Sequence, residues 1–247
     1  MPYVDDWLDV AHDGAATLWT LTEREAARAD VLDRICDAVL DQLVGLDVLG
    51  RLRFPLAAAA VRNRLPTKKR IRSGDLAEII ATDFVREKSE FSVPLLRLRY
   101  KDDRDMSMRG DDLIAIDRTL DPPAVMKAEV KSRAAISASV VRDACDALNA
   151  NSGRPKPSSL AFVSMTLRRQ GEDELAEIVE RFQEHDLPLS RLTHLVFILS
   201  GNDTTAALRP YLEQPVTVKE RRFVALRISD HQEFVELIFS RLDARNG

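Results

Sequence analysis

The sequence has no hydrophobic run long enough to cross a membrane, and it has almost no cysteine. Its longest apolar stretch, FPLAAAAV, is far shorter than the roughly 18 residues of a membrane-spanning helix. The opening segment, MPYVDDWLDVAHDG, is acidic and lacks the charged-then-apolar pattern of a secretion signal. Cys36 and Cys145 are far apart and have no metal-binding spacing, so we expect two buried thiols in a reducing compartment. We therefore expect a cytoplasmic protein that does not associate with a membrane.

Two common kinds of enzyme motif are missing as well. There is no glycine-rich phosphate-binding loop, so we do not expect this chain itself to hydrolyse ATP. No serine lies in the nucleophile-elbow context of the α/β-hydrolases, and there is no internal repeat. The 247 residues are 45% hydrophobic and 31% charged, which is typical of a globular protein with one large domain or a domain plus a small extension.

The chain is slightly acidic overall, but one segment is strongly basic. The net charge of −4 argues against a nucleic-acid partner, yet residues 51–74 contain eight basic side chains and no acidic one. Such a cluster can neutralise phosphates locally even when the chain is acidic. Taken alone, a solvated and flexible basic loop explains the cluster equally well. The candidate phosphate-binding residues in this basic run are Arg62, Arg64, Lys68, Lys69, Arg70 and Arg72.

Hydrophobic periodicity predicts helices first and strands afterwards. Apolar residues at helical spacing predict a long helix over residues 22–49, with Thr22 and Glu25 forming a capping box at its start. A short helix is expected over 56–65, and a third helix is expected to begin at a Ser73 cap. The period then changes from 3.6 to 2. Three strands are expected in VPLLRLRY (93–100), DLIAID (112–117) and VMKAEVKSR (125–133).

The second half of the chain alternates helices and strands. Helices are expected over 136–150, over 158–184 in two pieces broken near Gly171, and over 230–242. LTHLVFILSG and RRFVALRIS read as strands. This order predicts an α/β fold with a mixed β-sheet flanked by helices. We divide the chain into an N-terminal helical region, 1–58, and an α/β domain, 59–247.

A hairpin between the second and third expected strands brings two carboxylates together. With the turn at Leu120–Asp121, residues that face each other have numbers that sum to about 241, so Asp112 lies opposite Glu129. Their Cβ atoms are then about 5 Å apart, and two like charges at that distance are unfavourable unless a cation lies between them. Lys131 lies about 6.6 Å further along the same face and adds an amine at the edge of the site.

These groups suit a hard metal ion. Two carboxylates and a backbone carbonyl such as that of Val130 are oxygen ligands of the kind that Mg²⁺ or Mn²⁺ prefers, and no His or Cys set favours zinc. Such an ion can activate water and stabilise charge on a phosphoryl oxygen, while the Lys131 ammonium orients the water or neutralises the transition state. Glu78, on the helix before the strands, can complete the metal site or bind a second ion.

Each piece also has an ordinary explanation. An E-x-K triplet on a strand is common by chance, G-D-D before an apolar run is often only a turn, and Glu78 on a helix is normally a surface residue. The combination favours a site, because a helix acid, G-x-D, a turn, E-x-K and a second helix follow one another with compatible register.

This arrangement resembles the PD-(D/E)XK nuclease superfamily. The matching motifs are GDLAEI (74–79), GDD (110–112), EVK (129–131) and the helix that follows. The resemblance implies a restriction-endonuclease-like core that hydrolyses DNA phosphodiester bonds with bound metal. It also implies that Asp112 and Glu129 are metal ligands, that Lys131 is the catalytic amine and that Glu78 is an auxiliary acid. Because the motif is Gly-Asp-Asp rather than Pro-Asp, Asp111 competes with Asp112 for the ligand position; the alternation and the hairpin register favour Asp112.

A narrower resemblance covers more of the chain. GDLAEIIATDFV, RGDDLIAI, KAEVKSR and the trailing strands are similar to the nuclease subunit of the Hachiman antiphage defence system. That resemblance implies an endonuclease that acts in defence with a helicase (ATPase) partner. Two other functions stay open: a non-catalytic DNA-binding or assembly subunit, and a stand-alone repair or restriction-type endonuclease. If the protein is a nuclease, we expect the basic run to contact DNA phosphates without reading bases, with help from Arg97, Arg99, Lys127 and Arg133.

Overall fold

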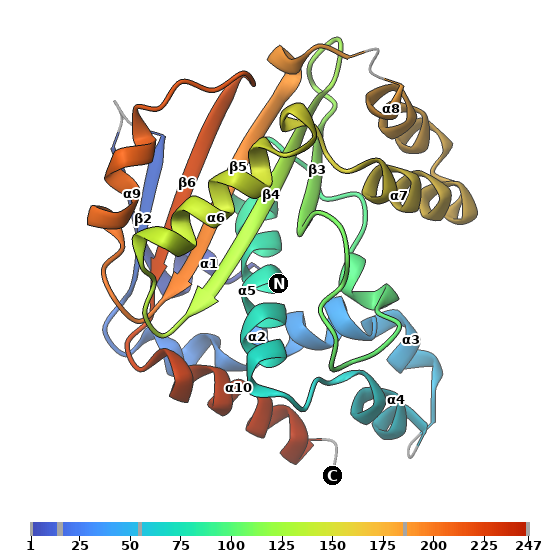
Figure 1. The fold of residues 1–247 in the computed structure, drawn as a ribbon. Coiled ribbons are helices and arrows are strands. Elements are labelled where there is room, and N and C mark those ends of the chain that lie inside the picture. Colours follow the sequence, from blue (N-terminus) through green and yellow to red (C-terminus); the bar gives the residue numbers. More distant parts are fainter. Residues whose placement is uncertain (1, 14–16, 54–55, 185–186, 246–247) are drawn as a thin grey trace.

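The computed structural model describes residues 2–13, 17–53, 56–184 and 187–245, and its centre is a six-stranded sheet with helices on both faces (Figure 1). The strands are β1 (Leu8–Asp13), β2 (Leu18–Glu23), β3 (Leu113–Asp117), β4 (Ala124–Arg133), β5 (Leu192–Ser200) and β6 (Glu220–Arg227). Their order in the sheet is β1-β2-β6-β5-β4-β3. The outer pairs β1–β2 and β3–β4 are antiparallel, and the inner pairs are parallel. The expected α/β fold with a mixed sheet is confirmed.

The helices form two layers. On one face, the core joins the sheet to α1 (Val4–Trp7), α2 (Ala27–Leu43), α5 (Lys69–Lys88) and α10 (His231–Arg245). The other face is covered by α6 (Ala138–Asn149), α7 (Pro157–Gln170), α8 (Asp173–Gln183) and α9 (Thr205–Leu212). Two further helices, α3 (Leu46–Arg51) and α4 (Leu56–Arg64), connect α2 to α5. Three short 3-10 turns complete the described chain: η1 (Arg97–Tyr100), η2 (Asn151–Gly153) and η3 (Leu189–Arg191).

Coverage of both faces explains the hydrophobic pattern of the strands. Every residue of β5 is buried, because a parallel strand in the middle of such a sheet has no face in contact with water. The two cysteines are buried free thiols, as expected. Among the residues described here, no helix combines the length and the apolar character that crossing a membrane requires.

The N-terminal segment contributes more than helices. Residues 1–58, expected to be helical, also contain β1 and β2, and β2 pairs in parallel with β6 so that Leu18 lies beside Phe223. The predicted capping box is wrong, because Thr22 belongs to β2 and α2 begins only at Ala27. The long helix also ends earlier than expected, at Leu43, since Gly45 adopts a φ of 97° and starts a new direction for α3.

The strand expected over 93–100 is wrong. The segment makes one isolated β-bridge, at Ser92, and then forms η1. Its buried residues are Leu95 and Leu98, which are three positions apart as in a 3-10 turn rather than two apart as in a strand. Arg97 bonds the Met108 carbonyl and Arg99 bonds Asp41. The alternation of leucine and arginine therefore does not reflect the two faces of a strand.

The start of α5 is also different from the expectation. The helix begins at Lys69, four residues before Ser73, whose hydroxyl instead bonds the Ser132 hydroxyl at 2.8 Å. The backbone N–H groups just before α5 donate to Asp105, which comes from a loop about forty positions further along the chain. A local sequence pattern cannot reveal a cap from such a distance. The expected helices near 56–65, 136–150, 158–184 and 230–242 and the strands β5 and β6 are confirmed.

Candidate functional site

The β3–β4 hairpin has the register that the sequence predicted. Leu113 pairs with Ala128 and Asp117 pairs with Ala124, so the paired residue numbers sum to 241 throughout. Asp112 immediately precedes β3 at the level of Glu129. Its Oδ2 atom accepts a hydrogen bond of 2.8 Å from the backbone N–H of Val130, which fixes the carboxylate against the edge of β4.

Glu129 and Lys131 form an ion pair on the same face of β4. The Lys131 Nζ atom lies 2.6 Å from Glu129 Oε1, and both side chains are only partly exposed. The pair places an ammonium group next to the carboxylate that faces Asp112. Two carboxylates and one amine, from residues 112, 129 and 131, therefore lie around one point at the end of the hairpin.

Asp112 is poorly compensated as a charged group. Burial, followed by the neighbouring Glu129 carboxylate, raises the pKa of Asp112 to about 6, while the Val130 N–H, Arg97 and Lys131 act in the opposite direction. The remaining electrostatic cost is what a bound cation would remove.

Glu78 approaches the Asp112 carboxylate from α5. Burial and then the Asp112 charge raise the pKa of Glu78 well above its ordinary value, and Arg97 partly offsets this. The Arg97 Nε atom lies 3.8 Å from Glu78 Oε2, which is too long for a hydrogen bond. Both atoms are buried without a hydrogen-bond partner in the part of the chain that the structure describes.

The donor set fits a hard divalent cation in its chemistry. Asp112, next to the start of β3, and Glu129 of β4 offer carboxylate oxygens, and Glu78 adds a buried carboxylate oxygen that lacks a hydrogen-bond partner among the described residues. In the described ranges, however, no group of three or more His, Cys, Asp and Glu side chains is close enough to hold a metal ion. The carboxylates of this site thus form neighbouring pairs rather than one closed cage. The roles predicted for them, and for the Val130 carbonyl, stay predictions.

The structure separates the two adjacent aspartates. Asp111 is buried and directed toward the start of α7: its Oδ2 accepts from the Lys156 N–H at 2.7 Å, and its own N–H donates to Ser159 Oγ at 2.8 Å. Lys127 lies 3.9 Å from the other carboxylate oxygen of Asp111. Asp111 is therefore engaged in holding the turn, which leaves Asp112 facing the carboxylates.

The environment of Lys127 differs from the one that the sequence predicted. The alternation of β4 placed it with Glu129 and Lys131 on a polar face near DNA, but its side chain is 1% exposed. Its ammonium donates to four backbone carbonyls at and just beyond the end of α6, those of Ala147, Leu148, Ala150 and Arg154. A contact between Lys127 and DNA is therefore excluded. Arg99 is also occupied, since it bonds Asp41 at 2.7 Å.

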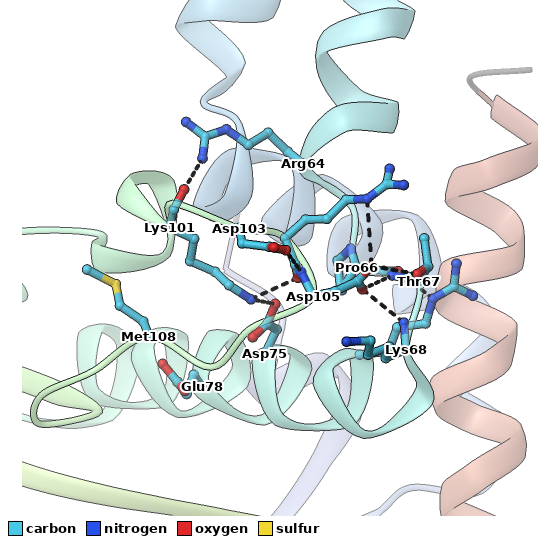
Figure 2. Close-up of polar contacts among 12 residues, drawn as sticks. Arg64, Pro66, Thr67, Lys68, Asp75, Glu78, Lys101, Asp103, Asp105 and Met108 are labelled. Carbon is cyan, nitrogen blue, oxygen red and sulfur yellow. Dashed lines mark hydrogen bonds and ion pairs between the residues drawn. The ribbon is translucent and has the colours of Figure 1, made fainter.

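A loop that we call the strap, residues 101–110, runs above the N-terminal half of α5 (Figure 2). Lys101 forms a buried ion pair of 2.6 Å with Asp75, whose pKa is raised to about 6 by burial despite the lysine. Asp105 accepts hydrogen bonds from Thr67 and from the Lys68 N–H, and these bonds lower the pKa of Asp105 to about 2. In Figure 2, the side chains of Asp75 and Glu78 lie on the side of α5 that faces the strap.

The basic run lies around the end of α4 and the start of α5, and part of it is already paired. Arg64 donates to the Lys101 carbonyl at 2.6 Å, and Lys69 pairs with Glu236 of α10 at 2.5 Å. Arg72 bonds Asp243 at 3.1 Å and stacks over Phe239. Lys68, Arg70 and Arg62 have exposed side chains. Lys68 and Arg70 therefore offer exposed positive charge at the start of α5.

Comparison with known proteins assigns a family to this chain's sequence. A family model described as HamA matches residues 4–242. A relative described as "Hachiman protein HamA", from Bacillus cereus, is 24% identical over 176 residues. This match covers 70% of the present chain and 62% of the relative, so the chain spans somewhat less than two thirds of that protein's length.

Proposed function

The chain belongs to the HamA family, and from that premise we propose that it is a metal-dependent deoxyribonuclease of Hachiman antiphage defence. The observation that supports the nuclease activity best is the position of Asp112 beside Glu129 and its Lys131 partner. At neutral pH the repulsion between these two carboxylates destabilises the fold, so stability alone does not explain why they lie together. The same residues support the resemblance to the PD-(D/E)XK superfamily.

The chain's own groups divide the work of phosphodiester hydrolysis. Asp112 and Glu129 would hold Mg²⁺ or Mn²⁺, with Glu78 and the Val130 carbonyl as further oxygen donors. The bound ion would supply a Lewis acid that lowers the pKa of water and stabilises charge on the phosphoryl group. Lys131 holds a positive charge where negative charge develops on the phosphate, and Glu129 fixes that ammonium in place. The Val130 N–H keeps the Asp112 carboxylate oriented.

One observation favours a second candidate function. Because no closed three-carboxylate group exists among the described side chains, a non-catalytic DNA-binding or assembly subunit that retains the fold as a scaffold also fits. The two candidates differ in one outcome, which is the cleavage of DNA by pure protein. A stand-alone repair or restriction-type endonuclease differs from the defence nuclease in lacking a helicase partner.

Incubation of the pure protein with supercoiled plasmid and Mg²⁺ or Mn²⁺ tests the proposal, alone and with a co-purified helicase partner. We expect nicked and linear products that disappear with chelator. Glu129→Ala and Lys131→Ala should each lower the rate at least about 10²-fold, because the first removes a carboxylate that would hold the metal ion and the second removes positive charge next to the phosphate. Cleavage that persists in both variants would refute the site, and no cleavage in any condition would favour the scaffold function.

The basic run should contribute affinity without sequence specificity. We expect the double substitution Lys68→Ala and Arg70→Ala to weaken DNA binding by a similar factor for every sequence, because these exposed cations neutralise phosphates. The slope of log affinity against log salt should fall by about 1 for each cation removed. Lys69→Ala is the matched control, since Glu236 already neutralises Lys69, and its effect should be smaller. Fluorescence anisotropy across a salt series measures both quantities; unchanged binding would reject this role.

A further inference from the structure

A cavity of about 710 Å³ lies next to the candidate metal centre. Glu78 and Asp112 form part of its wall, so it is continuous with the carboxylates. Most of the rest of the wall comes from η1, the start of β3, the strap and the first turns of α7, with Gln42 of α2 and Thr82 of α5. Its volume is within the roughly 300–1,000 Å³ of sites that hold small molecules or single side groups.

Two aromatic side chains border this cavity. Tyr100 of η1 and Phe162 of α7 both line it, with ring centroids 5.6 Å apart in an edge-to-face arrangement. The Tyr100 ring is held in place because its hydroxyl accepts a hydrogen bond of 2.8 Å from Gln170. Phe162 packs against the buried core between α7 and α8. Two rigidly supported rings beside a phosphodiester-cleaving site offer a surface on which a nucleobase can stack.

The charges of the lining make a phosphate an unfavourable occupant of the cavity interior. Five acidic and three basic residues line the cavity, and two of the basic ones are already engaged. Lys101 is paired with Asp75, and Arg97 bonds the Met108 carbonyl at 3.0 Å. An uncharged group that stacks on aromatic rings fits this lining better than an anion does. Leu98 and Ile114 add apolar surface to the same wall.

The aromatic and apolar side chains of the wall suit the flat face of a nucleobase. A base can present that face to the cavity only when it is not paired and stacked in a duplex.

We propose that this cavity receives one unpaired nucleobase of the DNA strand whose phosphate lies at Asp112 and Glu129, so that the substrate is single-stranded or locally melted DNA. The inference rests on the proposed nuclease function and adds the substrate class. It gives Tyr100 and Phe162 the role of binding the base beside the scissile phosphate. Blunt duplex DNA must lose a base pair before it can be cut, whereas single strands enter directly.

Two kinds of measurement test this assignment. Single-stranded oligonucleotides with 2-aminopurine at one position are bound to the full chain carrying Glu129→Gln, so that they are not cut. We expect quenching of 2-aminopurine on binding, and affinity about tenfold lower in Tyr100→Leu and Phe162→Leu, because each change removes a stacking ring. Tyr100→Phe, which keeps the ring and loses only the hydroxyl, should bind within about twofold of the parent.

The second measurement is cleavage in the otherwise unaltered protein. Single strands should be cut faster than blunt duplex of the same sequence, and Tyr100→Leu should lose that preference while Tyr100→Phe keeps it. The inference would be overturned if Tyr100→Leu and Tyr100→Phe showed equal 2-aminopurine quenching and an equal preference for single strands over duplex. Binding of single-stranded RNA but not DNA would also overturn it. Circular dichroism checks folding; if Phe162→Leu does not fold, Tyr100→Leu decides.

The outcomes distinguish the cavity from the proposed function. Cleavage of DNA without any dependence on Tyr100 leaves the nuclease function standing and removes the base-binding role. Ring-dependent quenching and binding without cleavage in any condition leaves the base-binding cavity standing and removes the nuclease function.

Discussion

Replacing Asp112 with asparagine should abolish DNA cleavage and, at the same time, make the fold more stable at pH 8. The loss of activity follows from removing one of the two facing carboxylates, and we expect a decrease of at least about 10²–10³-fold. The gain in stability follows from the raised pKa of Asp112, because its charged form is unfavourable in the folded protein. An asparagine oxygen can still accept the Val130 N–H. Few substitutions at residues that serve only structure would change the two properties in opposite directions.

The pH dependence of this gain has a definite sign. The pKa of Asp112 is about 6 in the folded protein, against 3.8 for the ordinary group, so the folded state binds the proton more tightly than the unfolded chain does. The penalty is absent below about pH 4, grows as the pH rises through 6 and is complete above it. The variant should therefore match the wild type in acid and exceed it by about 1–3 kcal/mol at pH 8.

Asp111→Asn is the matched control, one residue away. Asp111 bonds the start of α7 and faces Lys127, so its replacement should lower the free energy of unfolding by about 1–3 kcal/mol and leave most of the cleavage activity at low temperature. Urea unfolding at pH 5 and pH 8, together with plasmid cleavage, measures both variants. Mg²⁺ should raise the melting temperature of the wild type more than that of Asp112→Asn. If Asp111→Asn lost activity and Asp112→Asn kept it, Asp111 would be the metal ligand and Asp112 the structural residue.

The hairpin shows what the sequence could predict about the site. A turn signal and two alternating strands were enough to set the register, and the register alone placed Asp112 beside Glu129. These patterns are local. A shift of the strand pairing by one residue would turn the apolar face of the strand toward water, so few other registers are compatible with the sequence. The order of the later helices and strands was predictable for the same reason.

What could not be predicted depends on contacts between distant segments. The cap of α5 comes from Asp105, and the partner of Arg97 is Glu78, and neither pair is visible as a local pattern. The N-terminal strands join the sheet through the parallel pairing of β2 with β6, about two hundred positions away in the chain, and no local pattern shows that pairing. The cavity bordered by Tyr100 and Phe162 unites four segments that are separate in the chain.

Lys127 is the clearest case in which a correct strand assignment led to an incorrect environment. The alternation of β4 correctly placed Lys127 on the same face as Glu129 and Lys131, but that face changes along the strand from buried to partly exposed. At its buried end the face meets the end of α6, where carbonyl groups lack helical donors. A lysine there serves as an internal cap, and a sequence read strand by strand contains no sign of the helix end above it.

Substituting Lys127 with methionine should produce the largest loss of stability in this part of the fold. Burial lowers the pKa of Lys127 more than Asp111 raises it, so the ion pair alone is not the source of stability. The carbonyl groups that accept from its ammonium are the decisive partners. Methionine removes this donor from Ala147, Leu148 and Arg154, whereas Ala150 keeps the Gly153 N–H, and it leaves Asp111 without the Lys127 cation. Removing one member of such a buried set costs about 3–5 kcal/mol, which lowers the melting temperature by about 10 °C in a chain of this size.

Lys131→Met provides the control for this loss, since it makes the same chemical change on the same face of the same strand. Lys131 is partly exposed and pairs with Glu129 alone, so its replacement should change stability by less than about 1 kcal/mol. Cleavage should respond in the reverse order, with Lys131→Met inactive and Lys127→Met active at temperatures where it remains folded. Adding Asp111→Asn to Lys127→Met should restore part of the lost stability, because it removes the unpaired buried charge. Thermal unfolding followed by circular dichroism measures the wild type, the two lysine variants and the double variant. Equal melting temperatures for Lys127→Met and Lys131→Met would show that the carbonyl groups at the end of α6 do not need the Lys127 ammonium.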